Sequence, residues 1–159
     1  MRPIAHILSG AIMGGTIWAA TQNTDAAIYC GLGNVISDTD HLLEYGAYCL
    51  KCKVKPNLRE FMSGEYFSSK GTLMVIFHGH EHLLVLMFIS IFLKWKEHPS
   101  AQSGIAFTIG YGMHMLLDLI GNDCGIKGYS ILYRAAVKFD ERRICGKKYE
   151  EEAFPENML

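Results

Sequence analysis

Four long segments of this chain repeat apolar residues at every third or fourth position, a spacing typical of amphipathic α-helices. These segments cover residues 4–20, 26–49, 72–94 and 101–120. Alternating polar and apolar patterns, which predict strands, are nearly absent. We therefore expect an all-α fold in which the helices alternate in direction as an up-down four-helix bundle.

The C-terminal third predicts one further, shorter helix. Residues 129–144 carry an apolar stripe beside charged residues, whereas residues 50–70 form one long connection. With 159 residues the chain is long enough for one domain with a real core, and short for two. We expect a single helical domain over residues 1–145 and a solvated tail over residues 146–159.

Composition favours contact with a membrane over contact with nucleic acid. Hydrophobic residues make up 50% of the chain, charged residues only 19%, and the net charge is -1. In the expected bundle, every Lys and Arg except Lys94 and Lys96 falls on the side of the termini, an asymmetry typical of the cytoplasmic side. We expect a cytoplasmic-membrane protein with cytoplasmic termini. A soluble cytoplasmic protein is the alternative, because the charge-free run Leu83–Leu93 is shorter than the roughly 20 residues that span a bilayer.

The five cysteines are an odd number without a dense framework, which favours a reducing compartment. Cys49 and Cys52 form one isolated Cys-x-x-Cys pair, a weak signal of a redox dithiol or of half a zinc site. A thiol redox protein that works through this pair is one alternative function.

Histidines and acidic residues interrupt each apolar helix near the same end of the expected bundle. They are His6 in the first helix, Asp38, Asp40 and His41 in the second, His78, Glu81 and His82 in the third, and His114 and Asp118 in the fourth. Because the helices alternate in direction, these groups converge on one layer. Buried imidazoles and carboxylates persist only when they are paired or bound to metal. The sequence therefore predicts a metal site in this layer, facing the cytoplasm.

Helical spacing selects the candidate ligands within each motif. His114 and Asp118 lie one turn apart and point the same way, and so do His78, Glu81 and His82. Alternatively, Ser37, Asp38 and Asp40 can simply begin a helix. The predicted metal ligands are His6, Asp38, Asp40, His78, Glu81, His82, His114 and Asp118.

Imidazole nitrogens mixed with carboxylate oxygens suit zinc, and also iron or manganese. With more than four candidate ligands we expect one or two ions, bridged by Asp38 or Asp40 if there are two. Asp38 and Glu81 are also the candidate catalytic carboxylates. Tyr133 and Arg134 are candidate substrate contacts, because they return toward the same end of the bundle.

His6 and the stretches SDTDHLLEY, FHGHE, GYGMHMLLDLIGN and YSILYR resemble the bacterial family of membrane-bound metal-dependent hydrolases, which are similar to zinc-dependent phospholipase C and single-strand zinc nucleases. The family's polar pattern falls on His6, Asp38, Asp40, His78, Glu81, His114 and Asp118. Ser37 stands where many members carry proline. The resemblance implies an all-α, metal-dependent hydrolase.

The residues and the resemblance together predict a metal-dependent hydrolase of phosphoesters, with a small-molecule or lipid phosphoester as substrate. Basic residues of the 50–70 connection can meet an anionic headgroup; they are Lys51, Lys53, Lys55 and Arg59. The alternative is a non-catalytic helical membrane protein that uses the same ions for structure or for metal handling.

Overall fold

A computed structural model of the chain describes residues 3–122 and 124–146, and its elements are helices. The described residues contain no strand, only an isolated antiparallel bridge between Thr72 and Asp140. The predicted all-α class is confirmed. Of the predicted solvated tail, residues 147–159 lie outside the described residues.

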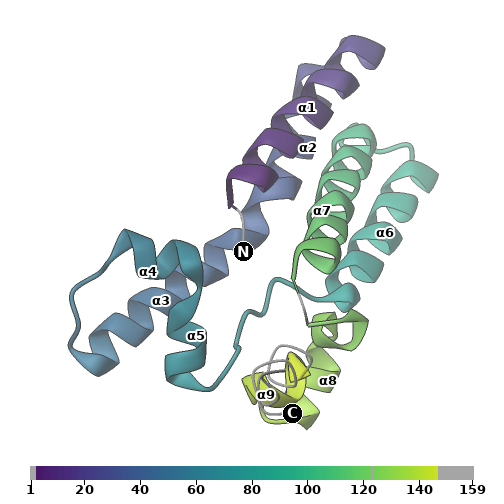
Figure 1. The fold of residues 1–159 in the computed structure, drawn as a ribbon. Coiled ribbons are helices and arrows are strands. Elements are labelled where there is room, and N and C mark those ends of the chain that lie inside the picture. The colour runs from purple at the N-terminus through teal and green to yellow at the C-terminus, as the bar shows by residue number, and fades with distance from the viewer. Residues whose placement is uncertain (1–2, 123, 147–159) are drawn as a thin grey trace, which may run out of the picture.

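Four long helices form two hairpins that lie side by side (Figure 1). The first hairpin joins α1 (Pro3–Thr21) to α2 (Thr24–Val35), and the second joins α6 (His80–Trp95) to α7 (Ala101–Gly121). The hairpins meet through α2 and α7, which contact each other along their lengths. The chain therefore places the end of α7 beside the end of α2.

Helices α2 and α7 run parallel, and every fourth residue of α2 contacts every fourth residue of α7. Ala26 packs near Ala106 in one buried cluster, Cys30 faces Gly110, and Asn34 faces His114. A Cβ atom at Gly110 would overlap the carbonyl oxygen of Cys30, so only glycine allows the two backbones to approach this closely. This approach brings the backbone of Asn34 within hydrogen-bonding reach of His114.

The second predicted helix, 26–49, is wrong as one continuous element. Helix α2 ends at Val35, a 3-10 turn η1 spans Ile36–Asp38, and α3 (Thr39–Cys52) then leaves in a new direction (Figure 1). In an unbroken α-helix, side chains two residues apart point about 200° away from each other. The turn changes these directions, so that Asp38 and Asp40 approach the same cluster.

The third predicted helix, 72–94, begins eight residues later than expected. Helix α6 starts at His80 with Gly79 as its extended N-cap residue, and residues 73–79 precede it without forming a helix. Their peptide groups are bound by side chains of other elements. The N–H of Phe77 donates to Asp40 at 2.7 Å, and the N–H of Met74 donates to Glu44 at 2.9 Å.

The predicted C-terminal helix, 129–144, is broken into shorter pieces. They are η2 (Ile126–Tyr129), α8 (Ile131–Ala136) and α9 (Glu141–Ile144). Lys138 and Phe139 between them both have a φ of 57°, which ends helical geometry. Asp140 then caps α9 by accepting the N–H of Arg143 at 3.1 Å.

The 50–70 connection contains two short helices, α4 (Leu58–Ser63) and α5 (Glu65–Lys70). They pack on α3 around an aromatic core in which the rings of Tyr45 and Tyr66 lie 4.9 Å apart. This core fixes α3 at one side of the polar layer.

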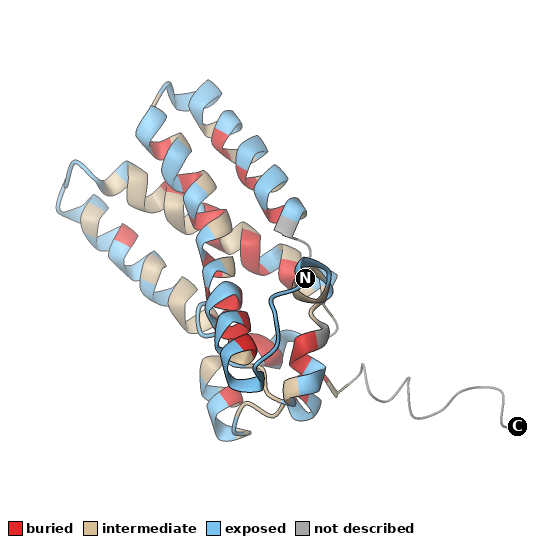
Figure 2. Ribbon diagram, turned by 90° about the vertical axis from the view of Figure 1, so that its left-hand side faces the viewer, coloured by how far each residue is buried: buried red, intermediate tan, exposed pale blue. Residues whose placement is uncertain are grey.

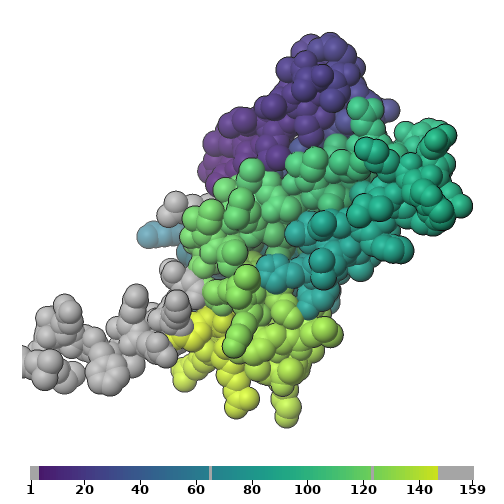
Figure 3. All heavy atoms as spheres, turned by 90° about the vertical axis from the view of Figure 1, so that its right-hand side faces the viewer, coloured from purple at the N-terminus to yellow at the C-terminus, as the bar shows by residue number. Residues whose placement is uncertain are grey.

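Large apolar side chains face outward along the long helices. Figure 2 shows exposed positions on their outer sides and buried ones where they meet, and Figure 3 shows the broad face that α6 and α7 form below α1 and α2. The exposed set includes Ile4, Ile7, Leu8 and Ile12 on α1, Leu84, Val85, Phe88 and Ile91 on α6, and Ile109, Leu116 and Ile120 on α7. Within the described residues, two helical stretches are long and apolar enough to cross a membrane, Ile4–Thr21 and Ala101–Gly121.

Candidate metal centre

Polar side chains from five parts of the chain meet where the long helices adjoin α3. They are His6 from α1, Asp38 from η1, Asp40 and His41 from α3, His78 from the segment before α6, and His114 and Asp118 from α7. All are buried except Asp38, which is partly buried. The predicted convergence of the four helical segments on one layer is confirmed.

Four acceptor atoms form the centre of this cluster: Nε2 of His78, Nε2 of His114, Oδ1 of Asp38 and Oδ2 of Asp118. The two imidazole nitrogens lie 3.0 Å apart. Asp118 Oδ2 lies 3.4 and 3.5 Å from those nitrogens, and Asp38 Oδ1 lies 3.6 and 3.9 Å from them. A tetrahedral zinc ion holds its ligand atoms about 3.3 Å apart. The separations among the two nitrogens and Asp118 Oδ2 are close to this value, so these three atoms can bind one ion, and Asp38 Oδ1 lies slightly farther from the nitrogens.

In both central histidines, Nδ1 contacts an acceptor behind the ring, which leaves Nε2 as the nitrogen that can bind an ion. His114 Nδ1 donates to the carbonyl oxygen of Asn34 at 2.8 Å, and His78 Nδ1 faces Oδ2 of Asp40 at 3.3 Å. Each neutral ring then presents the lone pair of Nε2 to the centre. Two lone pairs 3.0 Å apart repel unless a proton or a cation lies between them. The observed geometry fits a bound cation.

The surroundings of His78 and His41 shift the pKa values of their imidazoles in opposite directions. Burial, followed by the nearby His78, lowers the pKa of His41 to about 3, so that its imidazole is neutral, as a metal ligand must be. Burial also opposes the charge on His78, but hydrogen bonds with Asp38 and Asp40 outweigh it and raise its pKa to about 9. Without an ion, a proton therefore occupies this position, and a cation has to displace it.

Two further groups extend the centre in opposite directions. On one side, His6 Nε2 lies 3.1 Å from Oδ1 of Asp118, whose other oxygen faces the central histidines. On the other side, Asp40, His41 and His78 bring ligand atoms within 4.8 Å of one another. Oδ1 of Asp40 has no hydrogen-bond partner within the described chain. The cluster thus has the donor atoms for a second ion on either side.

His41 was not among the predicted ligands, although the Asp38-x-Asp40-His41 motif contains it. Its Nε2 lies 4.0 Å from Oδ1 of Asp38. In one continuous helix, His41 would not have pointed in the same direction as both carboxylates, and helical periodicity does not reveal the 3-10 turn Ile36–Asp38 before it. Only its position within the motif pointed to it.

Glu81 and His82 lie outside the three ligand groups found among the described residues. Both oxygens of Glu81 accept hydrogen bonds at the start of α8, from Ser130 Oγ at 2.7 Å and from the N–H of Ile131 at 3.0 Å. Glu81 thus caps α8 in this structure. The ring of His82 packs edge-on against Phe77, with its centroid 6.4 Å away.

The structure gives the two predicted substrate contacts different surroundings. Tyr133 donates its hydroxyl to the carbonyl of Arg143 at 3.1 Å, which ties α8 to α9. Arg134 is buried, and its two terminal nitrogens donate to the carbonyls of Val75 and His78. Arg134 therefore positions the segment that carries His78. Nothing in the sequence signalled this role.

A cavity of about 260 Å³ adjoins the centre. His41, His78 and Asp118 line one part of its wall, and Arg134 and Glu141 line another. Its size suits a small polar headgroup. The centre is therefore buried in protein but open to a small molecule.

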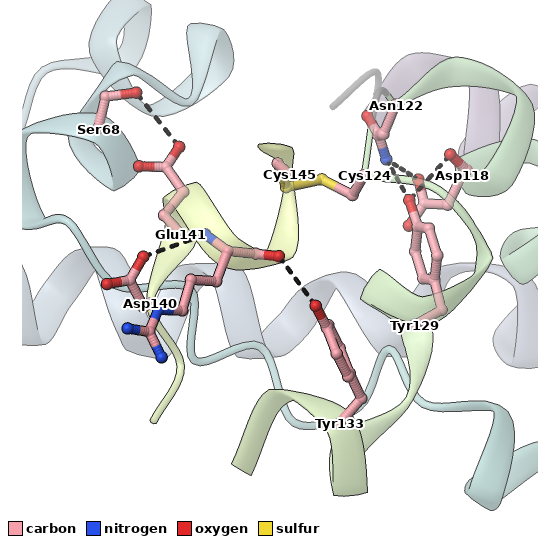
Figure 4. The surroundings of a disulfide bond; sticks show 10 residues. Ser68, Asp118, Asn122, Cys124, Tyr129, Tyr133, Asp140, Glu141 and Cys145 are labelled. Carbon is pink, nitrogen blue, oxygen red and sulfur yellow. Dashed lines mark hydrogen bonds between the residues drawn. A yellow bond between two sulfur atoms is a disulfide. The ribbon is translucent and has the colours of Figure 1, made fainter. Parts of the chain in front are cut away.

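A disulfide closes one side of this cavity. Figure 4 shows the bond between Cys124 and Cys145, which joins the chain after α7 to the end of α9, next to Asn122 and Asp118. This differs from the expected reducing compartment, because stable disulfides are typical of oxidising ones. Spacing alone could not pair these cysteines, which lie 21 residues apart. Cys49 and Cys52 are both free thiols.

Comparison of the chain with protein-family models, with curated proteins and with solved structures finds no match. The chemical nature of the centre follows from its own side chains. Mixed imidazole and carboxylate donors can hold a divalent metal ion, and this donor set suits zinc, iron and manganese.

Proposed function

We propose that the chain is a membrane-associated, metal-dependent phosphoester hydrolase of the bacterial membrane-bound hydrolase family that it resembles. The observation that carries this proposal is a set of three ligand atoms, from His78, His114 and Asp118, beside a cavity. A purely structural ion is enclosed by protein ligands, whereas a catalytic one needs room for water and substrate.

The side chains divide the work of such a site. His78, His114 and Asp118 would hold the ion and leave a position open for water, while Asn34 and Asp40 orient the imidazoles from behind. A divalent ion supplies a Lewis acid and lowers the pKa of water bound to it. Asp38 Oδ1 lies 3.6 Å from His78 Nε2, with 13% of its side chain exposed, and we assign to Asp38 the role of accepting the proton of the attacking water.

Arg134 supports a phosphoester as the substrate. Arg134 is one of the residues that line the cavity, and its Nε has no hydrogen-bond partner in the described chain. A fixed positive charge near the ions stabilises the negative charge that develops on phosphate oxygens during hydrolysis. A neutral substrate would not use this charge.

The outward apolar faces of α1, α6 and α7 support membrane association. We propose zinc as the resident metal, and an orientation in the cytoplasmic membrane that places the termini and the centre on the cytoplasmic side. The Lys and Arg distribution supports this orientation, whereas the Cys124–Cys145 disulfide on the cavity wall is typical of the opposite, oxidising side. A lipid or a soluble phosphoester reaches a centre placed there.

Metal content and hydrolysis test the proposal together. Protein purified in detergent without a chelator or a histidine tag is expected to carry about one to two zinc equivalents and to hydrolyse bis(p-nitrophenyl) phosphate. His114→Ala should lose both properties while keeping its helicity by circular dichroism. His98→Ala, which removes an exposed histidine from the α6–α7 connection, is the matched control and should keep both.

The non-catalytic alternative gives a different pattern in the same experiment. The nearly complete burial of His114 favours a structural or metal-handling ion. Bound zinc that is lost in His114→Ala, without hydrolysis by the wild type on any phosphoester tested, would favour that alternative. Absence of zinc after reconstitution with excess metal would exclude both.

A further inference from the structure

Glu141 is a buried carboxylate on the wall of the cavity that adjoins the metal centre. Only 4% of the residue is exposed. Its Oε1 accepts the hydroxyl of Ser68 at 3.3 Å, as Figure 4 shows. Its Oε2 has no hydrogen-bond partner among the described residues. One strong acceptor is thus left unsatisfied beside an open space.

The structure around Glu141 holds this acceptor in place. Glu141 begins α9, its N–H donates to the carbonyl of Gly71 at 3.2 Å, and the Cys124–Cys145 bond anchors the end of the same short helix. An unsatisfied buried carboxylate oxygen destabilises the folded protein unless a ligand or water supplies a donor. A fixed acceptor of this kind is typical of a ligand-binding group.

The missing partner has to be a hydrogen-bond donor, and a positive charge satisfies a carboxylate best. Arg134 lines the same cavity, but its two terminal nitrogens already donate to backbone carbonyls, and its unpaired Nε makes no hydrogen bond with Glu141. The donor is therefore expected from the bound molecule. The metal ligands on the cavity wall define where the phosphate of that molecule lies.

We propose that Glu141 binds the primary ammonium group of an aminoalkyl phosphoester whose phosphate lies at the metal centre. This inference rests on the proposed hydrolase function. The cavity of about 260 Å³ has room for an aminoethyl phosphate group but not for a whole lipid. The same headgroup occurs on lipids and on soluble esters.

Three chromogenic diesters test the proposal with zinc-loaded, full-length protein. They are the p-nitrophenyl esters of 2-aminoethyl, 2-hydroxyethyl and propyl phosphate, which are nearly equal in size. The first carries an ammonium group, the second a neutral hydrogen-bond donor, and the third no donor. We expect kcat/KM for the aminoethyl ester to exceed that for the propyl ester by about tenfold or more, with the hydroxyethyl ester between them. Glu141→Gln should reduce this ratio to near one. Glu97→Gln, at the far end of α6, should keep it.

The outcomes separate this inference from the proposed function. Metal-dependent hydrolysis of all three esters at equal rates would keep the hydrolase and overturn the ammonium site. If the wild type hydrolyses none of them, the hydrolase proposal fails, and calorimetric binding of phosphoethanolamine against propyl phosphate decides the inference. Tighter binding of phosphoethanolamine, lost in Glu141→Gln, would support the site, and equal binding would overturn it.

Two further arms identify the source of the headgroup. Phosphatidylethanolamine in mixed micelles represents the lipid source, and glycerophosphoethanolamine in solution represents the soluble one. Faster hydrolysis of one of these two substrates supports the ammonium site only if the rate on that substrate falls in Glu141→Gln. Zinc content and helicity of the variant are measured in the same samples.

Discussion

The Nε2 atoms of His78 and His114 lie 3.0 Å apart, and both rings are oriented by acceptors behind them. His78 lies in the segment before α6 and His114 lies on α7, 36 residues apart in the chain. Their approach depends on three structural features: the carboxylate of Asp40, the buried guanidinium of Arg134, and the close packing of α2 on α7. Each feature gives a testable prediction.

Asp40→Asn is expected to weaken zinc binding by about 10- to 100-fold, because the amide no longer orients His78 as a carboxylate does. Competition with a chromogenic zinc chelator measures this affinity. Asp25→Asn, on the exposed start of α2, is the control and should leave the affinity unchanged. Unchanged affinity in Asp40→Asn would show that Asp40 does not support the centre.

Arg134→Met should destabilise the fold by about 2 to 5 kcal/mol, because it leaves the buried carbonyls of Val75 and His78 without donors. Unfolding in detergent, followed by circular dichroism, measures the change in free energy. Arg59→Met, at an exposed position of α4, should change it by no more than about 0.5 kcal/mol. Equal effects of the two substitutions would contradict the positioning role of Arg134.

Gly110→Ala should separate α2 from α7, because the new methyl group meets the carbonyl of Cys30. We expect a loss of stability of about 1 to 3 kcal/mol or more, together with weaker zinc binding as His114 moves away from Asn34. Gly112→Ala is a matched control on the same helix, since its Cβ would lie 3.6 Å from Leu83, an ordinary contact. A stable Gly110→Ala protein with full zinc content would refute the close packing.

Removing the Cys124–Cys145 bond by Cys145→Ser should cost about 3 kcal/mol of stability, the value expected for a loop of this length. Thermal unfolding with and without a reducing agent measures the effect. The reducing agent should destabilise the wild type and leave Cys145→Ser unchanged. Cys52→Ser removes an exposed free thiol and serves as the control.

The orientation in the membrane can be read from Cys52, the one exposed free thiol among the described residues. If the basic side faces the cytoplasm, a membrane-impermeant maleimide should label Cys52 in right-side-out vesicles only after permeabilisation. In a Cys52→Ser background, a cysteine introduced by Glu97→Cys, on the side of the membrane opposite Cys52, should be labelled without permeabilisation. The reverse pattern would place the disulfide and the metal centre outside the cytoplasm.

Apolar periodicity and the positions of His6, Asp38, Asp40, His78, His114 and Asp118 were sufficient to predict the helical class and the layer in which these side chains meet. Helical periodicity identifies each helix from local sequence alone. When the helices alternate in direction, polar residues near the start of one helix and the end of the next lie at the same level of the bundle. The same reasoning could not find the breaks after α2 and before His80, because side chains of distant elements bind the backbone beside both: His114 binds the carbonyl of Asn34, and Asp40 binds the N–H of Phe77.

Helical spacing placed His78, Glu81 and His82 on one face, with His78 as the first candidate ligand, Glu81 as the second and His82 as the third. The tertiary structure separated them, because His78 lies before the helix begins, while Glu81 accepts the peptide groups that start α8. His41 joined the cluster for the same reason, through a turn that the sequence did not signal. The sequence by itself determined which elements form and which chemical groups are buried. Only tertiary packing decided which of those groups face one another, because hydrogen bonds between distant segments set the final direction of each side chain.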